Sequence, residues 1–244
     1  MHNAASSAPP SLAALSSELL REGWARRTAA EMLALLQTDE LGWQNFANEW
    51  RNLPVDKYMA DAGLYRRRRY GAFDLSSGSI VPVPRQPHYQ SLEHNALNGG
   101  IDRWFEPLVK EVADSAILRR ILECCHEACS GMELFIRAWR AEVHQFRIET
   151  TTNSAGFPTP EGCHRDGVTA GCIMLVARER VQGGETRLWT PDGSAQLASF
   201  QMTVPGEALF FDDRKLLHEV SPVFASPEVS GGHRDVLVVT FTSS

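Results

Sequence analysis

The sequence predicts an α+β protein in which a jelly-roll core, also called a double-stranded β-helix, carries a layer of N-terminal and central helices. Apolar residues recur at helical spacing through much of the first half, whereas the second half alternates short apolar stretches with turn residues. No linker is evident between the halves. We therefore expect one domain over residues 11–244, with a mainly helical layer over 11–130 and the jelly roll with a metal site over 131–244.

The helical layer is expected in two stretches. Apolar and aromatic residues three to four positions apart predict two or three amphipathic helices over residues 11–53, and two more over 101–113 and 115–129. Proline and glycine punctuate residues 54–87, which indicates strands and loops there. The first ten residues are small, polar and proline-rich, and we expect them to be disordered.

The jelly roll is expected from strand-like stretches after Gly131. They cover residues 142–150, 171–177, 186–190, 201–205, 208–212 and 235–242. Short strands at this spacing, with turn residues between them, are typical of two facing antiparallel sheets that can enclose a site.

Composition and charge favour a globular protein with a small-molecule partner. The 244 residues are 43% hydrophobic and 22% charged, which is the composition of a chain that buries a core. A net charge of -6 argues against nucleic acid as a partner, because such binding relies on Lys and Arg neutralising phosphates. No stretch approaches the roughly 20 apolar residues that cross a bilayer, and the first ten residues lack the basic region of a signal peptide, so we expect no membrane partner.

The cysteines indicate a reducing compartment. Their number, five, is odd, and Cys124 and Cys125 are adjacent, so they do not form the framework of a small secreted domain. We expect a cytoplasmic protein. Exposed apolar positions on the N-terminal helices would permit a homodimer.

Three residues in the second half could hold a metal ion. His164 and Asp166 are separated by one residue, so on an extended backbone both side chains project from the same face. His218 follows the apolar stretch 208–211 and could supply the third ligand. Two histidines and one carboxylate occupy one face of an octahedron and leave three positions open, as in non-haem Fe(II) oxygenases. A surface loop or a hydrogen-bonded pair is the alternative for the first two residues, and Asp212 or Asp213 could substitute as the carboxylate ligand.

Arg234 is a candidate anchor for an anion. It opens a stretch, residues 235–241, that is too apolar to leave a guanidinium in the sheet without an anionic partner. A planar fork suits bidentate capture of a carboxylate, and the distal carboxylate of 2-oxoglutarate would satisfy it. A structural salt bridge at the sheet edge is the alternative.

These features together resemble the Fe(II)/2-oxoglutarate-dependent dioxygenase superfamily. More narrowly, the chain is similar to the bacterial group that includes L-isoleucine dioxygenase and related hydroxylases of free L-amino acids. The matching stretches are residues 143–147, 158–167, 183–186, 211–214 with His218, and 234–241, with weaker likeness over 66–70 and 98–103. The order of these motifs is far more selective than any one of them.

The resemblance implies Fe(II) on His164, Asp166 and His218, with 2-oxoglutarate anchored by Arg234. It also implies that O2 is consumed and that an aliphatic free L-amino acid, such as isoleucine, leucine or methionine, is hydroxylated with release of succinate and CO2. Many members carry Ser or Thr two residues after the arginine, whereas Val236 stands there in this chain. Thr240 has the parity of Arg234 along the strand and is a candidate second ligand for the carboxylate.

An amino-acid substrate would bring two charges that the pocket must pair, because burying either one alone is costly. Arg147, which shares strand parity with Gln145, is a candidate partner for the carboxylate, and both are expected at the substrate. Glu161 is a candidate partner for the amine. A place on the outer face of the sheet is the alternative for Arg147. The basic run 66–69 is expected as a solvated face, although alternate arginines could also point inward.

Two other functions remain open from the residues alone. A cupin-like isomerase or hydrolase could hold zinc on the same three ligands and polarise a carbonyl or activate water. A non-enzymatic ligand-binding jelly roll would leave those ligands unexplained.

Overall fold

Two sheets face each other in the computed structural model, which describes residues 11–132 and 138–243; the disorder expected of residues 1–10 lies outside them. The helices are α1 (Leu12–Glu22), α2 (Ala29–Leu36), α3 (Glu40–Ala47), the 3-10 helix η1 (Asn48–Trp50), α4 (Lys110–Ala113) and α5 (Ala116–Met132). The strands are β1 (Trp24–Arg27), β2 (Arg66–Ser76), β3 (Ser79–Pro82), β4 (Ala138–Thr151), β5 (Ala170–Glu179), β6 (Val181–Gly183), β7 (Glu185–Trp189), β8 (Gln196–Gln201), β9 (Ala208–Asp212), β10 (Leu217–Val220), β11 (Val223–Ala225) and β12 (Gly231–Ser243).

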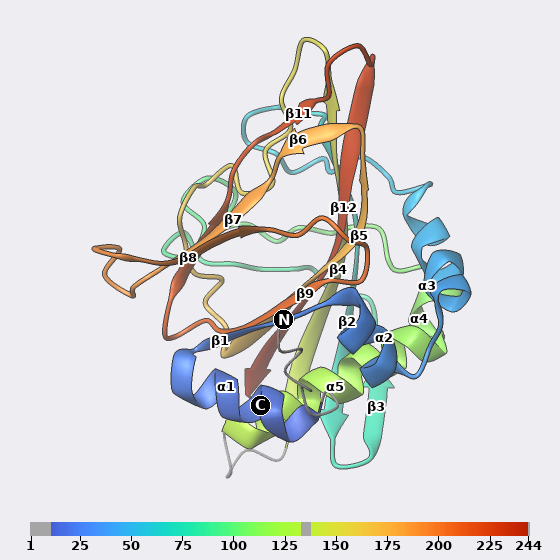
Figure 1. Cartoon of the computed structure of the whole chain (residues 1–244), viewed down its shortest axis with the longest axis vertical. Helices are drawn as coiled ribbons and strands as arrows, with labels where there is room; N and C mark the ends of the chain where they lie inside the picture. Colours follow the sequence, from blue (N-terminus) through green and yellow to red (C-terminus); the bar gives the residue numbers. More distant parts are fainter. Residues whose placement is uncertain (1–10, 133–137, 244) are drawn as a thin grey trace, which may run out of the picture.

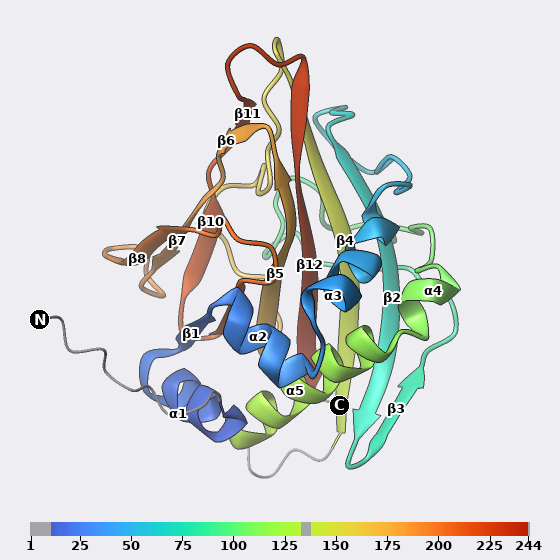
Figure 2. The ribbon, with the colours of Figure 1, turned by 45° about the vertical axis from the view of Figure 1, so that its right-hand side comes forward.

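The larger sheet has seven strands in the order β1-β9-β5-β12-β4-β2-β3, the smaller sheet that faces it has three in the order β10-β7-β8, and β11 pairs with β6 in a separate two-stranded sheet. All strand pairs in both sheets are antiparallel. In Figures 1 and 2 the helices α1, α2, α3 and α5 lie over one face of the larger sheet, and the smaller sheet lies on the other side. This arrangement confirms the predicted α+β fold with a jelly-roll core and a helical layer.

The helical layer is held by one apolar face of each helix. Residues Leu118, Ile121 and Leu122 of α5 are buried in the same core cluster as Leu15 and Leu19 of α1. That cluster also contains odd-numbered residues of the long strands, among them Val143, Leu237 and Val239. Because side chains alternate along a strand, the even-numbered residues of β4 and β12 face the space between the two sheets.

Two expected elements differ from those observed. Only Lys110–Ala113 is helical within the stretch 101–113, because Pro107 has no N–H to donate and the segment before it instead hydrogen-bonds to β2 through the Glu106 carbonyl. The strand expected over 201–205 lies earlier, at Gln196–Gln201, and the Glu207 carboxylate accepts the N–H groups of Thr203 and Val204 in the turn that follows. Strands β1, β2 and β3, from the range expected to be mainly helical, all join the larger sheet.

No helix within residues 11–132 and 138–243 combines the length and apolar character needed to span a bilayer.

Candidate active site

A cavity of about 590 Å³ opens between the two sheets. Its floor consists of alternate residues on the long central strands: Glu142, His144, Phe146 and Ile148 on β4, and Arg234, Val236, Val238 and Thr240 on β12. His164, Asp166 and His218 line the same cavity from the segment before β5 and from β10. The fold therefore brings the predicted metal residues and the predicted anion anchor into one enclosure.

The three predicted ligands meet across a short backbone bridge. The N–H of His164 donates to the carbonyl of His218 at 3.1 Å, and the N–H of His218 donates back to the carbonyl of His164 at 2.9 Å. One ligand atom from each of His164, Asp166 and His218 lies within 4.8 Å of the others. The two Asp166 oxygens are 3.5 Å from His164 Nε2 and 3.7 Å from His218 Nε2. A single ion between these atoms would contact all three side chains.

Local contacts set the orientation of the first two ligands. His164 Nδ1 donates to the carbonyl of Gly162 at 2.9 Å, so the neutral ring carries its lone pair on Nε2, which faces Asp166. Gly167 adopts a φ of +80°, and a Cβ there would lie 2.3 Å from the His94 ring. Glycine is therefore required for the chain to turn directly after Asp166.

The buried carboxylate of Asp213 holds the backbone of residues 166–168, which includes the predicted ligand Asp166. It accepts hydrogen bonds from the backbone N–H groups of Asp166, Gly167 and Val168, at 3.0, 2.8 and 3.1 Å. Burial and the nearby charge of Asp166 raise the pKa of Asp213 to about 6. Asp213 therefore fixes the segment that carries the predicted ligands, and three backbone N–H groups already occupy its carboxylate.

The electrostatics of the three ligands suit a cation. Burial would raise the pKa of Asp166, but the hydrogen bond from His164 and the charges of both histidines hold it well below the ordinary range. Burial would lower the pKa of His164, yet Asp166 and Glu161 raise it to about 9. Burial and the charge of His164 lower the pKa of His218 to about 4. The site thus contains a fixed carboxylate and attracts positive charge, which a divalent ion would supply.

Arg234 is buried at the cavity wall, and some of its N–H donors have no partner among the described residues. It is 1% exposed, and its Nε and Nη2 find no hydrogen-bond partner among the described residues. Burial and the charge of Arg178 lower its pKa to about 10. An anionic group in the cavity would satisfy these donors, and Thr240, which is also buried, lines the same cavity.

The structure separates the expected substrate residues. Glu161 lines the cavity, with Oε1 3.4 Å from His164 Nε2 and Oε2 without a hydrogen-bond partner among the described residues. Arg147 and Gln145 lie on the opposite face of β4, toward the helices, and do not line the cavity. Arg147 instead forms a bidentate ion pair with Asp235, at 2.8 and 2.7 Å. The role expected for Arg147 and Gln145 is therefore not supported by their placement, because odd positions of β4 point away from the site.

Several cavity residues were not expected from the sequence. Arg66 and Arg68 of β2 point inward and line the cavity, the alternative left open for the basic run, and Arg103 joins them from the segment before α4. Burial alternates along β2, with Arg66 and Arg68 buried. The alternation of side chains along a strand could have predicted that these two arginines share one face.

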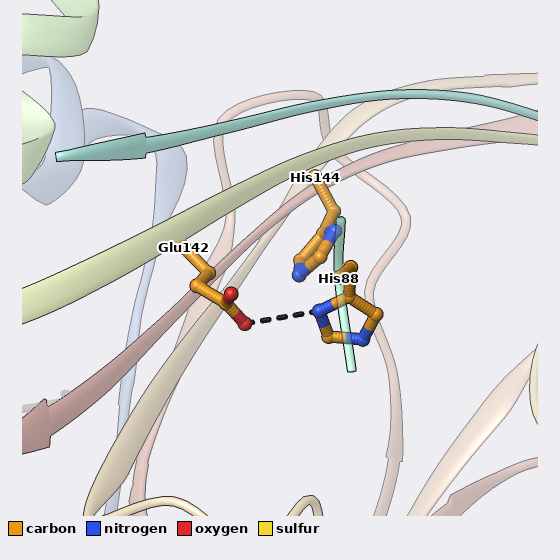
Figure 3. A group of neighbouring side chains, drawn as sticks. All are labelled: His88, Glu142 and His144. Atoms are coloured by element: carbon orange, nitrogen blue, oxygen red, sulfur yellow. Dashed lines mark hydrogen bonds and ion pairs between the residues drawn. The ribbon is translucent and has the colours of Figure 1, made fainter. Parts of the chain in front are cut away.

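His88, Glu142 and His144 form a second group of possible metal ligands in the cavity (Figure 3). His88 Nδ1 is 3.0 Å from a Glu142 oxygen, and Tyr70 donates its hydroxyl to the other oxygen. Arg68 Nη2 donates to His144 Nδ1 at 2.7 Å, so the remaining ring nitrogen of neutral His144 carries the proton. With one nitrogen occupied and a buried guanidinium alongside, this group suits a polar wall better than a cation site.

Comparison with known proteins identifies the family. The model of the 2OG-Fe dioxygenase family matches residues 47–240. A bsmA homologue from Methylobium petroleophilum PM1 is 31% identical, with a TM-score of 0.88 over 97% of this chain and 95% of that chain.

Two further solved structures share the fold. IDO from Bacillus thuringiensis has 20% identity and a TM-score of 0.79, over 96% of this chain and 100% of that chain. The Fe(II)/α-ketoglutarate-dependent dioxygenase TqaL has 17% identity and a TM-score of 0.76, over 95% and 87%. A search of curated proteins found no match.

The buried donors of Arg234 and the His-Asp-His cluster fit the two groups that this family uses, a 2-oxoglutarate carboxylate and an Fe(II) ion. The chain therefore belongs to the 2OG-Fe dioxygenase family and is an oxidoreductase that uses Fe(II), 2-oxoglutarate and O2.

Proposed function

We propose that this enzyme hydroxylates an aliphatic free L-amino acid of the isoleucine, leucine or methionine type, with release of succinate and CO2. The observation that carries the proposal is the mixed charge of the cavity beside the metal ligands. Glu161 offers a carboxylate oxygen that has no hydrogen-bond partner among the described residues, and arginines other than Arg234 line the same enclosure. Apolar walls from Ile173, Val220 and Val238 complete it, which suits a zwitterion with an aliphatic side chain.

Each group of residues has a separate task under this proposal. His164, Asp166 and His218 would hold the iron, and Arg234 with Thr240 would hold the distal carboxylate of 2-oxoglutarate. Iron with 2-oxoglutarate and O2 supplies the oxidising power. The protein orients the C–H bond, pairs the charges of the substrate and keeps bulk water out of the cavity. The Glu161 carboxylate would accept hydrogen bonds from the ammonium group of the substrate.

The metal-dependent isomerase or hydrolase is not favoured. Such chemistry needs the metal ligands but gives no reason for a fully buried arginine whose donors face the same cavity. A non-enzymatic jelly roll would explain neither feature.

The proposal is tested by supplying each L-amino acid with Fe(II), ascorbate and 2-oxoglutarate. We expect succinate to form in step with a product heavier by one oxygen atom, and both to be lost in Asp166→Ala. Asp192→Ala is the matched control, because Asp192 lies in an exposed turn and does not line the cavity. Turnover that persists without 2-oxoglutarate, or a panel in which no L-amino acid stimulates succinate formation, would overturn the proposal.

We also propose that the enzyme works in the cytoplasm. All five cysteines are free thiols in the structure, and four of them are buried, as expected in a reducing compartment.

A further inference from the structure

Arg103 is a second buried arginine of the cavity, and it forms no ion pair within the described part of the chain. It is 2% exposed, and its Nε has no hydrogen-bond partner among the residues that the structure describes. Its side-chain hydrogen bond within the described residues is a long one, 3.4 Å, from Nη2 to Gln90 Oε1. A guanidinium in this state is costly unless an anion reaches it, and Arg103 lines the active-site cavity.

Gln90 connects Arg103 to the metal site. Its Nε2 donates to the backbone carbonyl of Asp166 at 3.1 Å, while its Oε1 accepts from Arg103 and from Asn95 Nδ2. One glutamine side chain therefore spans the distance between Arg103 and a predicted iron ligand. An anion bound at Arg103 would lie at the side of the cavity next to the reacting centre.

Arg68 lies beside Arg103 and is held in a fixed plane. Its guanidinium carbon is 3.7 Å from the centre of the Phe105 ring and 4.5 Å from that of Phe146, and Nη2 donates to His144. Its Nε has no hydrogen-bond partner within the described parts of the chain. Arg103 also approaches Phe105, at 5.7 Å, so both guanidinium groups are arranged around one aromatic ring.

The local charges leave these two arginines short of an anion. Asp56 is 2.7 Å from Arg66 Nη2 and 3.8 Å from Arg68 Nη1, so one carboxylate is shared by two guanidinium groups. Burial and the charge of Arg66 lower the pKa of Arg103, although the carboxylates of Asp56, Glu161 and Glu142 act in the opposite direction. Burial and then the charges of Arg66 and Arg103 lower the pKa of Arg68. A bound carboxylate would relieve this repulsion.

We propose that Arg103 and Arg68 bind the α-carboxylate of the substrate, at a position separate from the cosubstrate carboxylate on Arg234. The inference rests on the proposed function and deepens it. Arg103 and Arg68 would then bind the carboxylate of the substrate, while Arg234 binds that of 2-oxoglutarate in the same cavity. Glu161 would pair with the ammonium group of the substrate. It follows that the substrate must carry a free α-carboxylate, so that an amide or an internal residue of a peptide is rejected.

The test is a binding cycle on the anaerobic complex with Fe(II) and 2-oxoglutarate, titrated calorimetrically with L-isoleucine and with L-isoleucinamide. We expect the wild-type enzyme to bind the acid at least about 30-fold more tightly than the amide, because a buried charge pair is lost in the amide complex. In Arg103→Gln the acid should bind at least about 30-fold more weakly, with the amide little changed. The Kd of 2-oxoglutarate should stay within about twofold, whereas Arg234→Gln should show the opposite pattern.

Arg68→Gln should likewise weaken binding of the acid and leave the Kd of 2-oxoglutarate unchanged, and Arg67→Gln is its matched control. Arg67 is the next residue on β2, points to the other face and pairs with Glu149 at 2.8 Å, so its loss should leave both ligands unaffected. Arg103→Lys keeps the charge without the planar fork and should retain part of the preference for the acid. It also provides the test if Arg103→Gln does not fold, as judged by circular dichroism.

The outcomes separate the inference from the proposed function. An unchanged preference for the acid in Arg103→Gln and Arg103→Lys, with normal amino-acid hydroxylation, overturns the inference alone. A weaker Kd for 2-oxoglutarate in Arg103→Gln would assign Arg103 to the cosubstrate and also overturn it. If L-isoleucine, L-leucine and L-methionine all fail to bind the wild-type complex and to stimulate succinate formation, the proposed function fails and the inference fails with it.

Discussion

Replacement of Asp213 by alanine should weaken metal binding although Asp213 is not a metal ligand. Its carboxylate is 1% exposed and accepts three backbone N–H groups from residues 166–168. A hydrogen bond to a buried charged acceptor contributes roughly 1.5–3 kcal/mol, so the three amount to about 4.5–9 kcal/mol before water refills the space. We expect the free energy of unfolding to fall by about 3 kcal/mol. The Kd for Mn(II) should rise about 10- to 100-fold, because Asp166 loses its support.

The assay is calorimetric titration of metal-free protein with Mn(II), beside urea denaturation followed by circular dichroism. Asp213→Asn keeps one accepting oxygen and should fall between alanine and the wild type. Asp212→Ala is the matched control: Asp212 is equally buried, but its carboxylate pairs with Arg214 at 2.9 Å. If Asp213→Ala loses as much stability as Asp212→Ala and still binds Mn(II) like the wild type, the supporting role is refuted.

Two further predictions concern buried charge and backbone space. Burial would raise the pKa of Asp56, but the charges of Arg66 and Arg68 outweigh it and lower the pKa from 3.8. The ionised carboxylate therefore stabilises the folded protein above pH 3.8, and this stabilisation is lost as the pH falls through the lower pKa that Asp56 has in the folded state. Asp56→Asn should therefore cost about 3 kcal/mol in urea denaturation at pH 7, with the gap to wild type closing below pH 3.8; a gap that stays constant would contradict this. In Gly184→Ala the new Cβ, at a φ of +71°, would lie 3.0 Å from Val223 Cγ1, 3.1 Å from Arg178 Nη1 and 3.2 Å from Arg234 Cδ, so it would crowd the wall that carries Arg234. We expect the 2-oxoglutarate affinity measured by calorimetry to fall about threefold for each ~0.7 kcal/mol of strain. Gly193→Ala has the same φ with its nearest atom at 3.7 Å, so equal effects of the two substitutions on affinity would refute steric displacement of Arg234.

The cluster of His164, Asp166 and His218 could be predicted because its signal is local. A spacing of two on an extended chain places two ligands on one face, and a histidine after an apolar strand is a natural third ligand. The resemblance then supplied the order of motifs. The structure adds what spacing alone cannot show, namely the backbone bridge that brings the third ligand to the other two.

Arg147 and Gln145 show what the alternation of side chains along a strand cannot predict. Alternation predicts that both lie on one face of β4, and they do, but it does not say which face holds the cavity. Both faces of this strand are largely buried, with Val143 toward the helices and Phe146 toward the cavity, so hydrophobicity does not distinguish them. The choice is made by long-range pairing of β4 with β2 and β12.

Arg103 was missed for a different reason. Apolar periodicity predicted a helix over 101–113, and a helical Arg103 would have had no defined relation to β2. In the structure the segment is extended, and the backbone of Arg103 pairs with that of His88 through two hydrogen bonds of 3.0 Å. Tertiary contacts here override a local pattern that Pro107 already weakened.

The bridge between His164 and His218 also gives a bound ion a structural role. Two of the predicted ligands lie in the segment before β5 of the larger sheet and the third lies on β10 of the smaller one, so an ion bound by all three would connect the two sheets. Binding of the metal would then stabilise the fold as well as supply the chemistry, because the same three side chains would hold the ion and join the two sheets.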